Sequence, residues 1–154
     1  MIFSWAPTAE LALATSADEL DAHFAVRERV FVRDQALFAG TDRDARDARS
    51  DTLHAVASVD GAIVGAVRLY PLRAALWKGD RLAVLPEARV HRVGALLVMF
   101  AVRTAGAYGG TRMVAQIQPA NVRFFERLGW TCDGPPAPYC GVTHQPMGIP
   151  LGVR

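Results

Sequence analysis

Apolar side chains recur at helical spacing in three stretches of this chain. Leu20, Phe24 and Phe31 mark one helix face behind a Ser16–Glu19 capping-box pattern, and they predict a helix over about residues 17–33. A longer and mostly apolar stretch predicts a buried helix from residue 93 to the glycine pair at 109–110. Residues 121–128 predict a short helix, with Gly129 as its stop.

Alternating and β-rich runs lie between these stretches and predict strands. They cover residues 11–14, 54–59, 62–70, about 80–84, 112–117, and two segments of the tail, 130–134 and 141–151. Asp60-Gly61 separates two of them and supplies the positive φ angles of a tight hairpin turn. Residues 40–51 lack periodicity and predict a charged surface loop. We therefore expect one α/β domain over residues 1–154.

Composition narrows the function classes. The formal net charge is only +2, and the arginines are scattered, which argues against a nucleic-acid surface. Lys78 is the only lysine. Cys132 and Cys140 lack zinc-ligand spacing and are expected to be two reduced thiols rather than a disulfide, so no metal is predicted.

The sequence shows no segment typical of a membrane span or a signal peptide, so we expect a cytoplasmic protein. The apolar run of residues 93–102 is far shorter than the ~20 residues of a membrane span. The N-terminal stretch has no basic region before it and is interrupted by Pro7 and Glu10, so we expect no signal peptide.

The segment from Arg89 to Ala95 leads from a strand into the longest helix. Unpaired backbone N–H groups and a positive partial charge at a helix start form a ready anion site. Gly94 would let a phosphate approach, and Arg89 and Arg92 add charge. Taken alone, this segment fits the start of a buried helix with flanking arginines better than a phosphate site, because Arg92 stands where a second glycine would be wanted.

The same segment resembles the central motif of the GNAT superfamily of acyl-CoA-dependent N-acyltransferases, R/Q-x-x-G-x-G/A. "VLPEAR" before it and "NVRFFERLGW" after it are similar to the flanking family motifs. A narrower likeness, to small ElaA-like GNAT proteins, rests on "RERVFVRDQ", on the Ala115-Gln116 pair and on "GVTHQPM". "R-x-x-V-F" also resembles the acyl-homoserine-lactone synthases. The likeness runs from about residue 11 to 151.

The resemblance implies a GNAT fold, with a mixed and mostly antiparallel central sheet flanked by helices. The strand ending near Val84 and the strand of residues 113–117 would splay apart and admit acetyl-CoA as co-substrate. Its pantetheine arm would pair with the backbone of Leu82, Ala83 and Val84. The other expected coenzyme A contacts are Arg89, Val90, His91, Arg92, Val93, Gly94, Ala95, Asn121 and Phe125. The simplest explanation of Asn121 is a helix cap, which is compatible with a coenzyme A contact, and Phe124, Phe125 and Trp130 are expected in the core.

Catalytic candidates follow from what direct attack of an amine on a thioester needs, namely a base and an acid. The family's usual acid, a tyrosine, is replaced here by Phe125, so either another group donates the proton, with Tyr139 and Cys140 nearby in the tail, or the thiolate leaves unassisted into water. His144 is the candidate base, because histidine is the side chain that ordinarily changes charge near neutral pH, although it equally fits a structural role closing the last strand. Glu87 and His54 are expected to be structural.

Acceptor contacts are assigned to Arg27, Gln35 and Gln116. Arg27 would hold a substrate carboxylate, or it would pair with an acid of residues 42–51. We expect an N-acetyltransferase acting on a small amine, with a homodimer as an option and no nucleic-acid or membrane partner. The alternatives are a non-catalytic acyl-CoA-binding module and an enzyme similar to acyl-homoserine-lactone synthases that uses S-adenosylmethionine; a purely structural or interaction protein ranks last.

Overall fold

The computed structural model describes residues 8–152, whose contacts cluster into two compact units. The first contains the chain up to Arg68 together with Arg81–Phe100, and the second contains Leu69–Asp80 together with the chain from Ala101 onward. The helices are α1 Ala17–Arg27, α2 Val93–Ala107 and α3 Val122–Arg127. The strands are β1 Glu10–Leu13, β2 Leu53–Val59, β3 Ala62–Arg73, β4 Leu76–Val84, β5 Arg112–Ile117, β6 Thr131–Cys132, β7 Ala137–Tyr139 and β8 Val142–Pro150.

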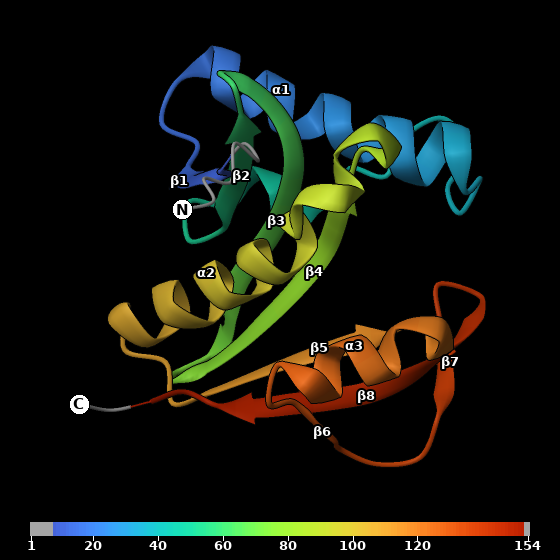
Figure 1. Ribbon diagram of the computed structural model, residues 1–154. Helices are drawn as coiled ribbons and strands as arrows, with labels where there is room; N and C mark the ends of the chain where they lie inside the picture. Colours follow the sequence, from blue (N-terminus) through green and yellow to red (C-terminus); the bar gives the residue numbers. More distant parts are fainter. Residues whose placement is uncertain (1–7, 153–154) are drawn as a thin grey trace, which may run out of the picture. The chain divides into compact units, whose positions relative to one another are not determined.

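The strands hydrogen-bond in the order β1-β2-β3-β4-β5-β8-β6, while β7 pairs with β8 alone (Figure 1). The pairs β1/β2, β5/β8 and β6/β8 are antiparallel, and β4/β5 is parallel. This confirms the expected α/β fold with a mixed sheet. It also adds β7, which lies between the two strands predicted for the tail.

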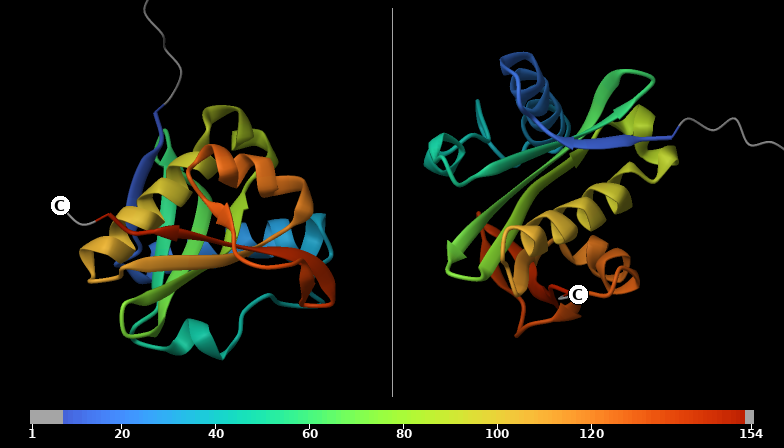
Figure 2. Two further views of the ribbon diagram at one scale, coloured as in Figure 1. Left: turned by 90° about the horizontal axis from the view of Figure 1, so that it is seen from below. Right: turned by 90° about the vertical axis from the view of Figure 1, so that its left-hand side faces the viewer.

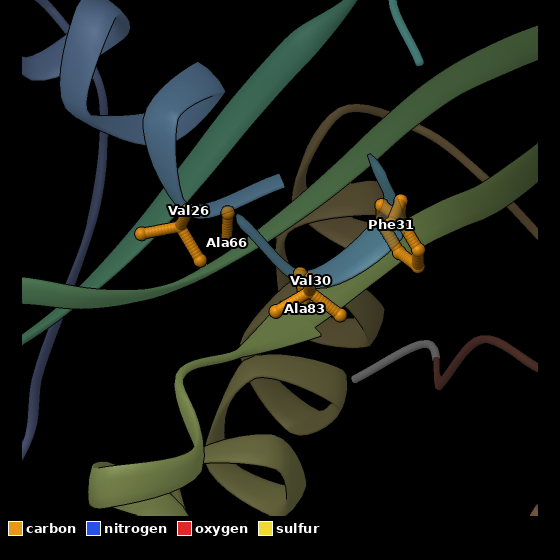
Figure 3. Close-up of a cluster of buried hydrophobic side chains, with 5 residues drawn as sticks. All are labelled: Val26, Val30, Phe31, Ala66 and Ala83. Carbon is orange, nitrogen blue, oxygen red and sulfur yellow. The ribbon is translucent and has the colours of Figure 1, made fainter. Parts of the chain in front are cut away.

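In the first unit, α1 begins at the predicted capping box. The Ser16 hydroxyl accepts from the Glu19 N–H, and the Glu19 carboxylate accepts from the Ser16 N–H. The predicted helix does not continue unchanged to Arg33, because Glu28–Asp34 is π-helical. Figure 3 shows how this segment packs: side chains of the helices, β3 and β4 form a buried cluster of Val26, Val30, Phe31, Ala66 and Ala83.

The β2–β3 hairpin turns at Asp60 and Gly61, with φ angles of 51° and 82°, as the sequence predicted. Farther along β3, Gly65 lies directly under the start of α2. A Cβ atom on Gly65 would approach Val93 Cγ1 to 2.7 Å and Leu97 Cδ1 to 2.8 Å. The missing side chain therefore lets α2 pack close to β3.

In the second unit, β5 and β8 pair along their whole common length, from Arg112 with Pro150 to Ile117 with Gln145. Helix α3 runs alongside these strands (Figure 1; Figure 2). Its end follows the prediction, since Gly129 has a φ of 96° and the Trp130 N–H bonds to the Phe125 carbonyl. Among residues 8–152, no helix is long and apolar enough to cross a membrane.

The pairing of β4 with β5 is short. The register covers Leu76–Lys78 with Arg112–Val114, although both strands continue beyond it. Strand β4 thus begins four residues earlier than predicted, and the early part is the part that pairs. Lys78 is the last residue of β4 in the register with β5.

Candidate acyl-coenzyme A site

The segment between β4 and α2 folds into a short 3-10 helix, Pro86–His91, followed by a sharp turn at Arg92. Arg92 has a φ of 56°, in the left-handed region that usually favours glycine. The first α-helical bond of α2 runs from the Leu96 N–H to the Arg92 carbonyl, at 3.1 Å. The N–H groups of Val93, Gly94 and Ala95 therefore precede that bond and have no partner within the helix.

One side of this helix start is packed into the core, and the other side carries exposed side chains. Val93 is fully buried and Ala95 nearly so, whereas Arg89 and Arg92 are exposed. Val90 is 82% exposed, which a core position would not be. The segment is therefore the start of a buried helix, with exposed arginines beside N–H groups that have no partner within the helix, the combination that suits a pyrophosphate.

The strand residues before this segment alternate in exposure. Ala83 is buried in the hydrophobic cluster of Figure 3, while Leu82 and Val84 are partly exposed. The Leu85 N–H donates to the Val64 carbonyl at 2.9 Å and fixes the end of β4 against β3. Leu82, Ala83 and Val84 are thus brought together with the segment from Arg89 to Ala95 in one unit.

The two catalytic candidates meet in the second unit, on the β7–β8 hairpin. In the register of that hairpin, Ala137 pairs with His144 and Tyr139 pairs with Val142. The rings of Tyr139 and His144 pack edge to face with centroids 5.3 Å apart. Lys78 joins them from β4: its Nζ donates to the Tyr139 hydroxyl oxygen at 3.1 Å and lies 4.6 Å from the ring centroid.

The protonation pattern of His144 follows from its hydrogen bond. Nδ1 lies 2.8 Å from the carbonyl oxygen of Val142, which can only accept, so Nδ1 carries the proton. In the neutral ring, Nε2 then holds the lone pair. His144 is buried, as a strand-closing residue would be, and its tautomer also suits a base acting through Nε2.

Three further expected site residues, Phe125, Asn121 and Gln116, lie in the second unit. Phe125 is buried and packs edge to face against Trp130, with centroids 5.3 Å apart, so its ring belongs to the core. Asn121 is exposed, and within the described residues its side chain caps no N–H of α3, which is contrary to the cap interpretation. Gln116 is partly exposed on β5, opposite Pro146.

Arg27 follows the ion-pair alternative rather than the substrate one. Its side chain is 0% exposed, and its Nε donates to Asp42 at 2.7 Å. Its two terminal nitrogens donate to the Asp47 carboxylate at 2.8 and 3.1 Å. Nη1 also lies 3.2 Å from His23 Nε2. These donors are directed to groups of the protein itself, so Arg27 is not placed to receive a substrate carboxylate.

The prediction of a charged surface loop holds for most of residues 40–51, which are exposed, but not for Asp42 and Asp47. Asp42 is buried, and a 3-10 helix, Ala45–Ala48, directs Asp47 inward. Arg81 donates to the Asp42 carbonyl at 3.0 Å, and Arg68 contacts Asp44 and Asp47 at 2.6 and 3.1 Å. Two aspartates of this surface segment thus belong to a largely buried ion network.

The pKa values of Asp47 and His23 in this network are strongly displaced. Burial opposes ionisation of Asp47, but hydrogen bonds from His54 and Arg27 outweigh it and hold the pKa far below its usual range. Burial lowers the pKa of His23 to about 3, and the positive charge of Arg27 acts in the same direction. His23 is therefore neutral at physiological pH, with Nδ1–H donating to the Ala55 carbonyl at 3.0 Å.

The remaining candidates lie at the surface or serve the fold. Glu87 forms an exposed ion pair with Arg29 at 3.4 Å, and His54 bonds to Asp47 at 3.0 Å, so both are structural, as expected. Gln35 is exposed just after the π-helical segment. Both cysteines are free and exposed.

Comparison with known proteins decides the family. The model of the Acetyltransferase (GNAT) family matches residues 15–130, which is most of the chain and includes the segment between β4 and α2. The chain belongs to the GNAT acetyltransferase family. GNAT proteins are N-acyltransferases, and the matched residues include the helix start described above.

Solved structures agree on the fold. A candidate N-acetyltransferase from Lactobacillus plantarum is 22% identical, with a TM-score of 0.84 over 94% of this chain and 99% of that one. Escherichia coli ElaA is 19% identical, with a TM-score of 0.79 over 94% and 99% of the two chains. A CoA-dependent acyl-homoserine lactone synthase solved with SAM and isopentyl-CoA is 18% identical, with a TM-score of 0.75 over 96% and 84%. A comparison with curated protein sequences gave no significant match.

The contact of Lys78 with Tyr139 and the ion network around Asp42 and Asp47 were not predicted from the sequence. For Lys78 one signal was available, because it is the only lysine in a chain whose other basic residues are all arginine. For the two aspartates, no periodicity marked them as buried. Their burial depends on Arg27 and Arg68, which are distant in sequence.

Proposed function

We propose that this GNAT protein transfers an acetyl group from acetyl-CoA to the primary amine of a small molecule. The observation that carries the proposal is the start of α2, where three successive N–H groups precede the first helical bond beside exposed Arg89 and Arg92. Coenzyme A is an anionic ligand, and such a helix start attracts it through N–H donors and the helix dipole together.

The adenosine diphosphate part of the cofactor would lie on Val90–Ala95, and the pantetheine arm would pair with backbone groups of Leu82–Val84. The structure supports this assignment in one respect: Ala83 and Val93 are held by the core, so the backbone around them is fixed before a ligand arrives. A preformed site avoids the entropic cost of ordering a loop on binding.

For the transfer itself, the amine nitrogen attacks the thioester carbonyl carbon and the C–S bond breaks. His144 Nε2 would take the proton lost by the amine, and Tyr139 would give its phenolic proton to the thiolate. The contact between the two rings supports their acting in one site. Phe125 stands at the position of the usual family acid, and its side chain has no proton to donate.

One feature favours a second candidate, a GNAT module that binds acyl-CoA without catalysis. The position of the usual family acid holds Phe125, which is packed into the core and has no proton to donate. A third possibility is that the acceptor amine is that of S-adenosylmethionine, as suggested by the fold of the acyl-homoserine lactone synthase. The Arg27 part of that likeness is explained by the ion network.

We infer a cytoplasmic protein, with two free thiols that suit a reducing compartment and a possible homodimer. Its acceptor partner would be a small molecule rather than a nucleic acid or a membrane.

The function is tested by mass spectrometry of the purified protein for bound coenzyme A species, followed by measurement of thiol release from acetyl-CoA with a panel of small amines that includes S-adenosylmethionine. We expect a co-purifying CoA species and amine-dependent thiol release. Binding without thiol release for any amine would favour the non-catalytic module. The absence of both would reject the proposal.

A further inference from the structure

Lys78 is the only lysine of the chain and takes part in a contact that family membership does not explain. It lies on β4 at the last position paired with β5, opposite Val114. Its side chain is partly buried and reaches the hydroxyl of Tyr139 on β7, which is 61 residues away in sequence. Two elements that share no pairing are thus joined by one ammonium–phenol contact.

The direction of this hydrogen bond limits what the phenol can do. A lysine ammonium can only donate, so the Tyr139 oxygen accepts at 3.1 Å and the phenolic proton is not used in this bond. The neighbouring His144 ring contacts Tyr139 edge to face, and its Nδ1–H is already bonded to Val142. The phenol is therefore held as a donor, with a fixed positive charge beside the oxygen that becomes negative once the proton leaves.

We propose that Lys78 is a positioning residue for Tyr139, and that the pair replaces the acid that Phe125 cannot supply. This inference rests on the proposed acyl transfer. As the C–S bond breaks, the thiolate sulfur takes the Tyr139 proton and leaves as the thiol. The phenolate forms next to the Lys78 ammonium, which stabilises it by charge and by the existing hydrogen bond, and the phenolate recovers a proton from solvent before the next turnover.

The position of Lys78 suits this role. The register of β4 with β5 ends at Lys78 and Val114. The backbone of Lys78 is therefore fixed by β5, while its side chain reaches Tyr139 on β7.

The test compares four variants with wild type: Lys78→Met, Lys78→Arg, Tyr139→Phe and the double variant Lys78→Met/Tyr139→Phe. We expect Lys78→Met and Tyr139→Phe each to lower kcat by at least about tenfold, within the range that general acids contribute, with KM for acetyl-CoA changed by less than about threefold. Lys78→Arg, which keeps the charge and the donors, should restore most of kcat. Tyr108→Phe is the matched control, because Tyr108 is exposed and touches Trp77 instead.

The double variant decides whether Lys78 acts through Tyr139. If it does, Lys78→Met has no further effect in the Tyr139→Phe background, because residues that act as one unit are not additive. Multiplying losses, or an unchanged kcat in Lys78→Met, would overturn the inference while leaving the acyl transfer intact.

A binding measurement provides a readout apart from turnover. If the phenol donates to the cofactor sulfur, wild type should bind coenzyme A about threefold or more tightly than desulfo-coenzyme A, as one hydrogen bond implies. Both Tyr139→Phe and Lys78→Met should abolish that ratio. An equal affinity for the two ligands in wild type would overturn the inference, whereas failure to bind either ligand would instead reject the proposed function.

Discussion

Arg27 and Asp42 show how much of this fold depends on single buried charges. Asp42 accepts from Arg27 at 2.7 Å and lies 3.2 Å from Arg81, and both of its closest partners are buried with it. Removing one member of such a network leaves the others without compensation for the loss of water. The loss of stability on such a substitution is therefore determined by the charged groups that stay buried without a partner.

We expect Asp42→Ala to lower the free energy of unfolding by about 3–5 kcal/mol, as measured by urea denaturation. Glu87→Ala is the matched control, because Glu87 pairs with Arg29 at the surface, and this change should cost less than about 1 kcal/mol. Similar losses for the two variants would show that the Asp42 network does not stabilise the fold.

Arg92 is the residue at which the sequence suggested a flaw and the structure explains it. Its φ of 56° is a conformation that glycine adopts without strain, so Arg92→Gly removes a charge but fits the backbone. Gly94 lies in the first turn of α2, where the proposed site would place a phosphate. We expect Gly94→Val to weaken coenzyme A binding by more than about tenfold and Arg92→Gly by less, as measured by dissociation constants. The reverse ranking would mean that the register of the segment is wrong.

At the scale of elements, the sequence predicted what periodicity and turn chemistry determine locally. The capping box, the Asp60-Gly61 hairpin and the glycine that ends α3 all appear where expected. The π-helical Glu28–Asp34 and strand β7 did not follow from local signals. A short π-helical interruption of a helix has no sequence signal of its own. Strand β7, with Pro138 in the middle of three residues, forms because β8 offers it a partner.

The close contact between β3 and α2 makes a prediction about these elements. Gly65→Ala should lower the free energy of unfolding by about 1–3 kcal/mol, because its Cβ would overlap Val93 and Leu97 and push the start of α2 outward. Coenzyme A binding should weaken with it. Gly106→Ala is the control, because Gly106 lies near the end of α2 and its nearest neighbour is 3.8 Å from the added Cβ. This change should raise the free energy of unfolding by up to about 1 kcal/mol. Equal effects of both on Tm would contradict this view of the packing.

At the scale of the whole molecule, the His23 pKa of about 3 predicts a stability that depends on pH. The unfolded chain would protonate His23 near pH 6.5, so between about pH 6.5 and 3 the unfolded state binds the extra proton. Stability is therefore complete above pH 6.5 and falls as the pH drops towards 3, by up to about 1.4 kcal/mol per pH unit.

Urea denaturation from pH 7 to 4 tests this prediction, with His23→Gln as the comparison. The variant should lose part of the slope at pH 4–6, because the depressed pKa of Asp47 acts mainly at lower pH. Parallel curves for the two proteins would show that His23 is not the group that titrates.

The candidate site was only partly accessible from sequence. The Arg89–Ala95 segment could be found because its residues are contiguous and their spacing matches a family motif. The contact of Lys78 with Tyr139 could not, since it depends on how the β7–β8 hairpin folds back towards β4. Arg27 could not be assigned either, because a substrate contact and a buried ion pair both require an arginine on that helix face.

The most direct test of the account is calorimetric titration of the wild-type protein with acetyl-CoA and with coenzyme A. We predict saturable binding of both at one site per chain, lost or greatly weakened in Gly94→Val and retained in the Tyr108→Phe control. No saturable binding of either ligand to a folded wild-type protein would contradict the assignment of the α2 helix start as a coenzyme A site, and with it the proposed function.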